Sequence, residues 1–219
     1  MSSRYSGVAW ATAADFERQR INSVLSWPGT GRTECKVPTE LCYGNGQDKL
    51  WGYQIPSHEP RLQLFKLLLL DPQDLSSEMQ SSPLVQRARD VLRNSGKSAV
   101  QVIADYLQLL WNHTQEILNK ALGRAVVAGL PFHFVMTIPA IWKPYARQRM
   151  QEAVTKAGLM SRRLAGQTYL SFAPEPEAAA LATLLERQWS ITQGSTHVVC
   201  DAGGGTVVRI LSHKTEDSS

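Results

Sequence analysis

The sequence predicts an α/β fold with a partly parallel sheet. Its second half alternates apolar β-branched runs with helical stripes, in the order strand, helix, strand, helix, strand. The longest stripe carries apolar residues at helical spacing from about Ser98 to Leu122, and Gly123 ends it. At 219 residues, with 43% hydrophobic residues, the chain can bury the core of one domain or of two small ones.

The first half predicts short strands joined by turns. In order, the strands are expected at residues 5–11, 21–27, 36–43 and 51–56. The second of these strands ends in a turn at residues 28–31, and Pro38 places the third at a sheet edge. Residues 71–97 are polar and contain two prolines, which predicts a loop with a short helix.

The second half gives clearer signals. Residues 132–138 predict a buried strand that stops at Pro139. A helix is expected over residues 143–157, with Pro144 in its first turn and Gly158 as its cap. A short strand at 169–173, a helix at 177–188 and a final pair of strands complete the chain.

Charge and hydropathy argue against two classes of partner. The net charge is +4 without a Lys/Arg block, so we expect no nucleic acid or membrane partner. The mean hydropathy is −0.23, and prolines interrupt the most apolar window, residues 125–142, which predicts a buried strand rather than a membrane span. The polar start around Arg4 is unlike a signal peptide. We therefore expect the cytoplasm or the nucleus.

The cysteines predict neither a disulfide framework nor a metal site. Cys35, Cys42 and Cys200 are odd in number and far apart, with no CxxC pair. We expect reduced, structural thiols.

A glycine run near the end of the sequence is the main candidate for ligand binding. Asp201 ends an apolar run and is followed by Gly203, Gly204, Gly205 and Thr206 before a second apolar run. Successive glycines let backbone N–H groups converge on an anion, and the aspartate could hold a hydrated divalent cation. An ordinary glycine-rich hairpin fits the same residues.

Two charged residues have two readings each. Lys66 is the charge inside the apolar run 62–70, and it either extends to the surface or points into a polar cleft. Glu175 lies at the start of a helix, where an acidic residue favours the helix dipole whether or not it has a chemical role.

Several ordered segments resemble the nucleotide-binding domain of the seventy-kilodalton heat-shock chaperones. In the second half they are Thr137-Ile138-Pro139-Ala140, Lys156-Ala157-Gly158-Leu159, Pro174-Glu175-Pro176-Glu177-Ala178-Ala179-Ala180-Leu181-Ala182 and Asp201-Ala202-Gly203-Gly204-Gly205-Thr206. In the first half, segments such as Tyr5-Ser6-Gly7-Val8-Ala9-Trp10 and Phe65-Lys66-Leu67-Leu68-Leu69 resemble the divergent fungal and animal branch of the "twelve" type.

The resemblance implies a role for each matching residue. The stretch from Asp201 to Thr206 is similar to the second phosphate loop, with Asp201 reaching Mg²⁺ through water and the cofactor being ATP or ADP. Glu175 matches a carboxylate near the metal and the attacking water, and Lys66 matches the lysine that reaches the γ-phosphate. Pro139 matches a hinge proline. These are roles that phosphoryl transfer requires.

The resemblance also implies the domain layout. The family has an actin-like, ribonuclease-H-like ATPase fold of two lobes. The chain corresponds to lobe I, with a core subdomain at about 1–27 and 115–219 and a smaller subdomain inserted at about 28–114. On this resemblance we expect the chain to lack the second lobe and the first phosphate loop, which in the family precedes the strand that matches Tyr5.

These departures shape the expected function. The family places an aspartate two residues after the loop threonine, where this sequence has Val208. We expect a truncated, chaperone-like ATPase-domain protein that binds ATP by ancestry and hydrolyses it weakly or not at all. The alternatives are an incomplete chain of an active ATP-dependent chaperone and a sugar or small-molecule kinase of the same superfamily. Expected partners are co-chaperones or client proteins, with self-association through apolar surface that the second lobe would cover.

Overall fold

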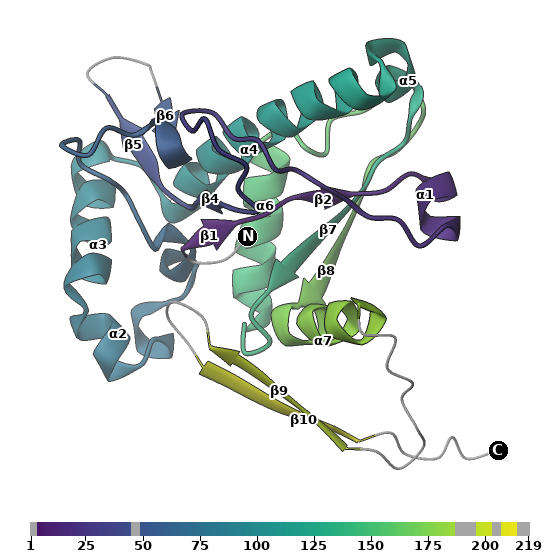
Figure 1. Cartoon of the computed structure of the whole chain (residues 1–219). Helices are drawn as coiled ribbons and strands as arrows, with labels where there is room; N and C mark the ends of the chain where they lie inside the picture. The colour runs from purple at the N-terminus through teal and green to yellow at the C-terminus, as the bar shows by residue number, and fades with distance from the viewer. Residues whose placement is uncertain (1–3, 45–48, 187–195, 203–206, 214–219) are drawn as a thin grey trace.

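The chain contains both helices and strands, which alternate from residue 133 to residue 202, and this confirms the mixed α/β class (Figure 1). The structure is a computed structural model that describes residues 4–44, 49–186, 196–202 and 207–213. The helices are α1 (Ala13–Glu17), α2 (Ser77–Ser81), α3 (Pro83–Ser95), α4 (Ala99–Leu122), α5 (Arg124–Gly129), α6 (Pro144–Lys156) and α7 (Glu175–Glu186). Three 3₁₀-helices are η1 (Gly52–Gln54), η2 (Phe65–Leu69) and η3 (Pro72–Asp74).

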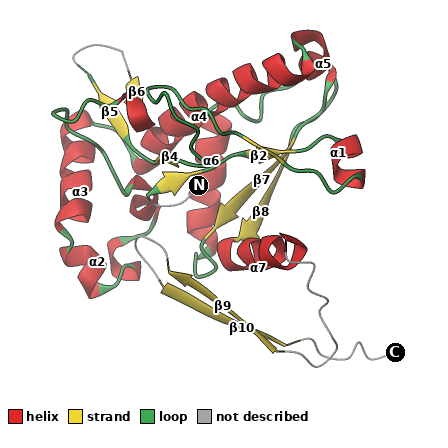
Figure 2. Cartoon of the chain, viewed as in Figure 1, coloured by secondary structure: helices red, strands yellow, loops and turns green. Residues whose placement is uncertain are grey.

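The strands form pairs rather than one continuous sheet within the described ranges (Figure 2). The antiparallel pairs are β1 (Tyr5–Ser6) with β4 (Val37–Pro38), β2 (Ala9–Trp10) with β3 (Asn22–Ser23), β5 (Leu41–Tyr43) with β6 (Lys49–Trp51), and β9 (Thr196–Ala202) with β10 (Val207–His213). β7 (His133–Ile138) and β8 (Tyr169–Pro174) pair in parallel. The predicted partly parallel sheet is thus represented by a parallel pair.

The predicted strands of the first half are shorter in the structure. The strand expected at 5–11 is divided into β1 and β2, because Ser6 pairs with Val37 whereas Ala9 pairs with Ser23. The strand expected at 51–56 is wrong beyond Trp51, since η1 follows directly. The predicted turn after Trp27 is confirmed, and Gly29 has φ +84° there. A Cβ at Gly29 would lie 2.6 Å from the Tyr53 carbonyl carbon, so the turn requires glycine.

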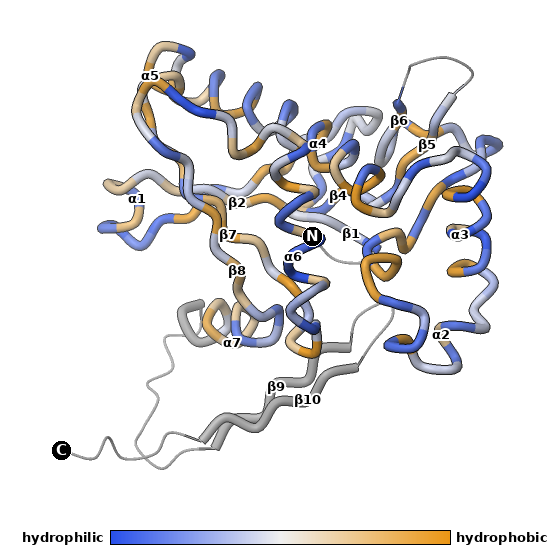
Figure 3. The backbone as a smooth tube through the Cα atoms, turned by 180° about the vertical axis from the view of Figure 1, so that it is seen from behind, coloured by the Kyte–Doolittle hydropathy of each residue, from blue (hydrophilic) through white to orange (hydrophobic). Residues whose placement is uncertain are grey.

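The two long predicted helices are confirmed with their caps. Ser98 caps α4, accepting a hydrogen bond from the Gln101 N–H while the Gln101 side chain accepts one from the Ser98 N–H. Figure 3 shows orange and blue alternating along α4, as its apolar stripe requires. α6 starts with Pro144 in its first turn, and Gly158 follows its last residues with φ +80°.

Two segments contain more helix in the structure than the sequence predicts. Residues 71–97 contain η3, α2 and the 13-residue α3 instead of a loop and one short helix. Pro83 starts α3 rather than interrupting it, because the first helical position needs no N–H donor. Residues 124–129, part of the window predicted to be a strand, form α5, where the Arg163 side chain donates hydrogen bonds to the Val127 and Leu130 carbonyls.

The core unites residues from both predicted subdomains. α4 packs against α6 and η2, and an aromatic cluster lies beside it. Trp51 meets Trp27 and Tyr106 at ring-centroid distances of 6.3 and 5.9 Å, and Phe65 lies 5.5 Å from Tyr106. This cluster holds η2, and therefore Lys66, against α4.

The strand at 133–138 is half-exposed, so its predicted burial is wrong. One face, which includes Phe134 and Met136, packs against the core. On the other face Val135 is 61% exposed, and Tyr169 of β8, which pairs with His133, is 58% exposed. The alternation follows from the period-two geometry of a strand that is covered on one face.

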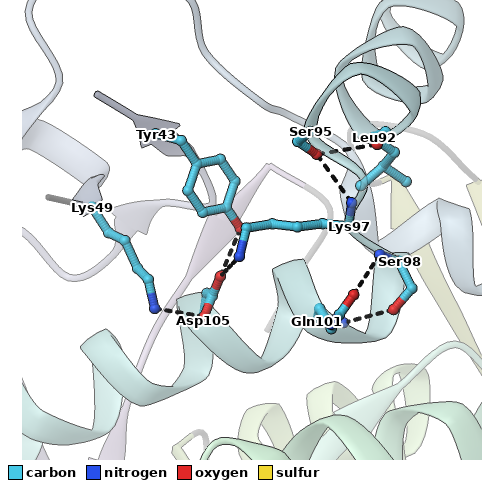
Figure 4. A network of polar contacts seen from close by, with 8 residues as sticks. All are labelled: Tyr43, Lys49, Leu92, Ser95, Lys97, Ser98, Gln101 and Asp105. Carbon is cyan, nitrogen blue, oxygen red and sulfur yellow. Dashed lines mark hydrogen bonds and ion pairs between the residues drawn. The ribbon is translucent and has the colours of Figure 1, made fainter. Parts of the chain in front are cut away.

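A polar network fastens the strands β5 and β6 to α4 (Figure 4). The Asp105 carboxylate of α4 accepts hydrogen bonds from Lys49 Nζ at 2.6 Å, from Tyr43 Oη at 2.8 Å and from Lys97 Nζ at 3.2 Å. Lys97 Nζ also lies 4.8 Å from the centroid of the Tyr43 ring. Burial alone would raise the pKa of Asp105, but these hydrogen bonds together hold the pKa below its ordinary value.

Among the described side chains, Cys35 and Cys42 are free thiols, as expected for the reduced state. Cys200 lies on β9. No helix in the described ranges has the length and apolar character that crossing a membrane requires.

We expect Asp105→Ala to lower the free energy of unfolding by about 2 kcal/mol at pH 7, because Tyr43 and two lysines lose a partly buried charged acceptor. A carboxyl pKa lowered by folding stabilises above the unfolded pKa of about 3.9 and loses this effect as the pH falls through the folded pKa. The difference in the free energy of unfolding between Asp105→Ala and the wild type should therefore become smaller at acidic pH. Urea unfolding at several pH values measures it.

The matched control is Asp90→Ala, which removes an exposed carboxylate paired with Arg93 within α3. Its effect should stay within about 0.5 kcal/mol. An Asp105→Ala loss no larger than this, or one that does not narrow in acid, would contradict the role of the network.

Candidate functional site

The carboxyl ends of β7 and β8 bring two predicted site residues to one edge. Ile138 pairs with Pro174 in the parallel register, so Pro139 and Glu175, the next residue of each chain segment, leave the sheet side by side. Loops at the carboxyl end of parallel strands are where α/β proteins place their ligands. Glu175 is also the first residue of α7, so the reading as a helix-opening acid holds as well.

The 3₁₀-helix η2 directs Lys66 inward. Leu64 precedes η2 with φ +55°, a left-handed conformation that is uncommon for a non-glycine residue, and its side chain is buried with Leu67, Leu75 and Val85. Lys66 itself is 1% exposed. The reading in which this lysine extends to the surface is therefore wrong.

Lys66 and Glu175 form an ion pair across the fold. Lys66 Nζ lies 2.5 Å from Glu175 Oε1, and the Glu175 side chain is 24% exposed whereas the Lys66 side chain is 1% exposed. The ammonium also lies 5.3 Å from the centroid of the Trp142 ring, which is itself buried. The pair thus has its cation in the interior and its anion at the boundary with solvent.

Burial determines the direction in which the pKa of Lys66 is shifted. Desolvation lowers the pKa of the Lys66 ammonium, and the charge and hydrogen bond of Glu175 act in the opposite direction. Taking an ammonium out of water costs several kcal/mol, which a close carboxylate offsets only in good geometry. Glu175 therefore favours the charged form of the Lys66 ammonium, which burial disfavours.

The glycine run is only partly within the described residues. Asp201 lies near the end of β9, and Val208 of β10 is directly opposite it in the antiparallel register. Gly203, Gly204, Gly205 and Thr206 lie outside the described residues. β9 contacts α7, the helix that begins with Glu175. The structure thus brings Lys66, Glu175 and Pro139 together.

One residue of this site escaped the sequence reasoning. Trp142 follows the strand that ends before Pro139, and its ring is the aromatic neighbour of Lys66. A tryptophan close behind a strand end, beside a predicted hinge proline, is a signal that could have indicated it. Within the described ranges, no group of three or more His, Cys, Asp or Glu side chains is arranged to hold a metal ion.

We expect the two partners of the ion pair to differ in their effect on stability. Glu175→Ala leaves the buried ammonium without its carboxylate and should lower the free energy of unfolding by about 3 kcal/mol. Lys66→Met leaves Glu175 at the boundary with solvent, so we expect it to change the free energy of unfolding by less than about 1 kcal/mol. Chemical denaturation measures both.

Glu177→Ala is the matched control, since it removes an exposed carboxylate from the same first turn of α7. The Glu175→Ala deficit should also shrink as the pH rises toward the ordinary lysine pKa of about 10.4. A lysine whose pKa is lowered by folding costs stability below the folded pKa, and deprotonation removes this cost. Equal losses in Lys66→Met and Glu175→Ala would contradict this account.

Comparisons with known proteins place the chain among heat-shock chaperones. It is 30% identical over 190 residues to human "Heat shock 70 kDa protein 12B", an alignment that covers 80% of this chain and 26% of that protein. It is 36% identical over 118 residues to "Chaperone protein HscA homolog" of Laribacter hongkongensis, covering 54% of this chain and 16% of that protein. The corresponding protein of Acinetobacter baumannii is 29% identical over 114 residues.

The chain spans about a quarter of the length of its human relative and less of the bacterial ones. No family model matches the sequence. The chain belongs to the seventy-kilodalton heat-shock protein family.

Proposed function

We propose that this chain forms the phosphate-binding side of a chaperone-type ATPase domain and binds ATP or ADP together with Mg²⁺. The observation that carries the proposal is the ion pair of a fully buried lysine with Glu175, at the carboxyl edge of the parallel strand pair. Burying the cation of an ion pair is costly for stability, because the desolvation of the charge offsets the attraction within the pair. Binding of a polyanionic ligand gives a reason for a buried lysine at this position.

The proposed fold is lobe I of an actin-like ATPase. Its core subdomain would comprise about residues 1–27 and 115–219, and the inserted subdomain about 28–114. The support is the family membership together with the parallel β7–β8 pair and the helix α7 that follows it. α4 would lie at the junction of the two subdomains.

In this proposal the residues have distinct tasks. The Lys66 ammonium is the cation that faces the γ-phosphate, and Trp142 and Glu175 hold it in place. The Glu175 carboxylate, open to solvent, orients a water molecule, while Asp201 and the backbone of Gly203, Gly204, Gly205 and Thr206 cradle the phosphates. Pro139, beside Glu175 at the same edge, serves as the hinge.

The residues fit Mg²⁺ only as a hydrated ion. Mg²⁺ usually keeps several waters and takes one or two carboxylates plus substrate phosphates, which Asp201 and Glu175 could supply. When bound, Mg²⁺ neutralises phosphate charge. Val208 stands where the family places a second loop carboxylate, and the loss of that charge supports slow hydrolysis by this chain.

The chaperone role itself belongs to the same proposal. The printed names of the relatives describe a heat-shock protein and chaperone proteins. Partners of the corresponding kind are co-chaperones and client proteins, and exposed apolar residues such as Val135, Ile141 and Leu181 are available for protein contacts, including self-association.

We expect isothermal titration with ATP–Mg²⁺ to detect binding that Lys66→Met weakens at least tenfold, because the ligand loses its buried cation. Lys120→Met, which removes an exposed lysine of α4, is the matched control and should bind like the wild type. Hydrolysis should be slow in all three proteins. Far-UV circular dichroism checks that the variants are folded.

Equal ATP affinity in Lys66→Met and Lys120→Met would overturn the role of Lys66. Hydrolysis at the rate of an ordinary chaperone, lost in Asp201→Ala, would instead overturn the proposal of slow turnover and favour an active ATPase.

A further inference from the structure

A hollow of about 340 Å³ is lined by none of the residues proposed for nucleotide binding. It is bounded by the end of η2, the start of η3, α3, the first turn of α4 and one side chain of α6. We call it the Arg89–Arg149 pocket, after the two arginines in its wall. Its remaining wall is mainly apolar and includes Leu68, Leu92 and Val100.

Arg89 brings a positive charge into the wall of this pocket. It is half-buried on α3, and within the described residues it has no hydrogen bond or ion pair. The neighbouring arginine of the same helix, Arg93, is by contrast paired with Asp90 at 2.5 Å. A guanidinium that is partly withdrawn from water without an acceptor is a ready site for an anion.

Arg149 is held rigidly and still offers donors. Its Nη1 donates to the Leu69 carbonyl at 2.7 Å and to Asp71 Oδ1 at 2.9 Å, and its guanidinium carbon lies 4.7 Å from the centroid of the Tyr145 ring. Within the described residues these hydrogen bonds use Nη1 and leave Nε and Nη2 without a protein acceptor. A guanidinium has five donor N–H groups, so several remain for a ligand.

The charges in the wall add to +1, because the carboxylate of Asp71 offsets one of the two arginines. The ligand should therefore carry one negative charge and an apolar group to cover the leucine and valine side chains. A pocket of this size encloses about two amino-acid residues, and arginines beside apolar side chains are typical anchors of protein interfaces.

We propose that the Arg89–Arg149 pocket binds a short acidic and apolar peptide segment of a partner protein. A carboxylate of the peptide meets Arg89 and the free donors of Arg149, and the adjacent apolar side chain packs against Leu92 and Val100. The site is a docking point that is separate from the proposed nucleotide site.

Fluorescence polarisation tests this with the full chain and a fluorescein-labelled peptide of sequence Gly-Ser-Asp-Leu-Phe-Gly. We expect saturable binding that Arg89→Met weakens at least tenfold, because the carboxylate loses its unpaired cation. Arg87→Met removes an exposed arginine of the same helix and is the matched control, with unchanged affinity expected. The peptide with Asn in place of Asp should also bind at least tenfold more weakly.

Two further measurements separate the alternatives. Inorganic phosphate at equal concentration should not displace the peptide, and Arg89→Met should leave ATP binding unchanged, because Arg89 lies outside the proposed nucleotide site. The proposal is overturned if no saturable binding occurs, or if Arg89→Met and Arg87→Met have equal affinity. It is also overturned if the Asn peptide binds as well as the Asp peptide, or if phosphate competes as effectively as unlabelled peptide.

Discussion

Burying the Lys66 ammonium is the constraint on which the centre of this molecule depends. The charge must be met by an anion, and the anion comes from Glu175, 109 residues further along the chain. Meeting this requirement fixes the position of η2 relative to the first turn of α7, and so relates the two parts of the chain. The aromatic cluster around Phe65 holds η2 from the other side. The packing of the apolar core and the pairing of the buried Lys66 charge with Glu175 thus favour the same position of η2.

Local signals predicted the elements whose ends are fixed by their own residues. The Ser98–Gln101 capping box, Gly123 and Pro144 are short-range features, and α4 and α6 start and end as they indicate. Pro83 was misleading because proline both breaks and starts helices, and only the residues that follow decide which. The 3₁₀-helix η2 could not be predicted, since a run of leucines fits a strand or a helix equally well.

For the candidate site, the sequence indicated which residues to consider but not which of them contact one another. Lys66 stood out as a charge in an apolar run, yet its partner could be found only in three dimensions. Trp142 was missed because its place close behind the strand end at Pro139 indicates a position near the site, whereas its contact with Lys66 is visible only in three dimensions. The half-exposed strand β7 was misjudged for a similar reason, since Phe134 and Val135 are equally apolar and only the fold decides which of them is covered.

The helix α4 has a mechanical consequence. Its 24 residues make a rod about 36 Å long. Asp105 near its start is hydrogen-bonded to Tyr43 of β5 and Lys49 of β6, and His113, about 12 Å further along the helix, meets the Ser26 carbonyl at 2.7 Å. An unbroken helix resists bending. The strands β5 and β6 and the segment at Ser26, which are hydrogen-bonded to α4, therefore keep fixed positions relative to one another. Since α4 also packs against α6 and η2, the segment that carries Lys66 is tied to the same rod as β5, β6 and Ser26.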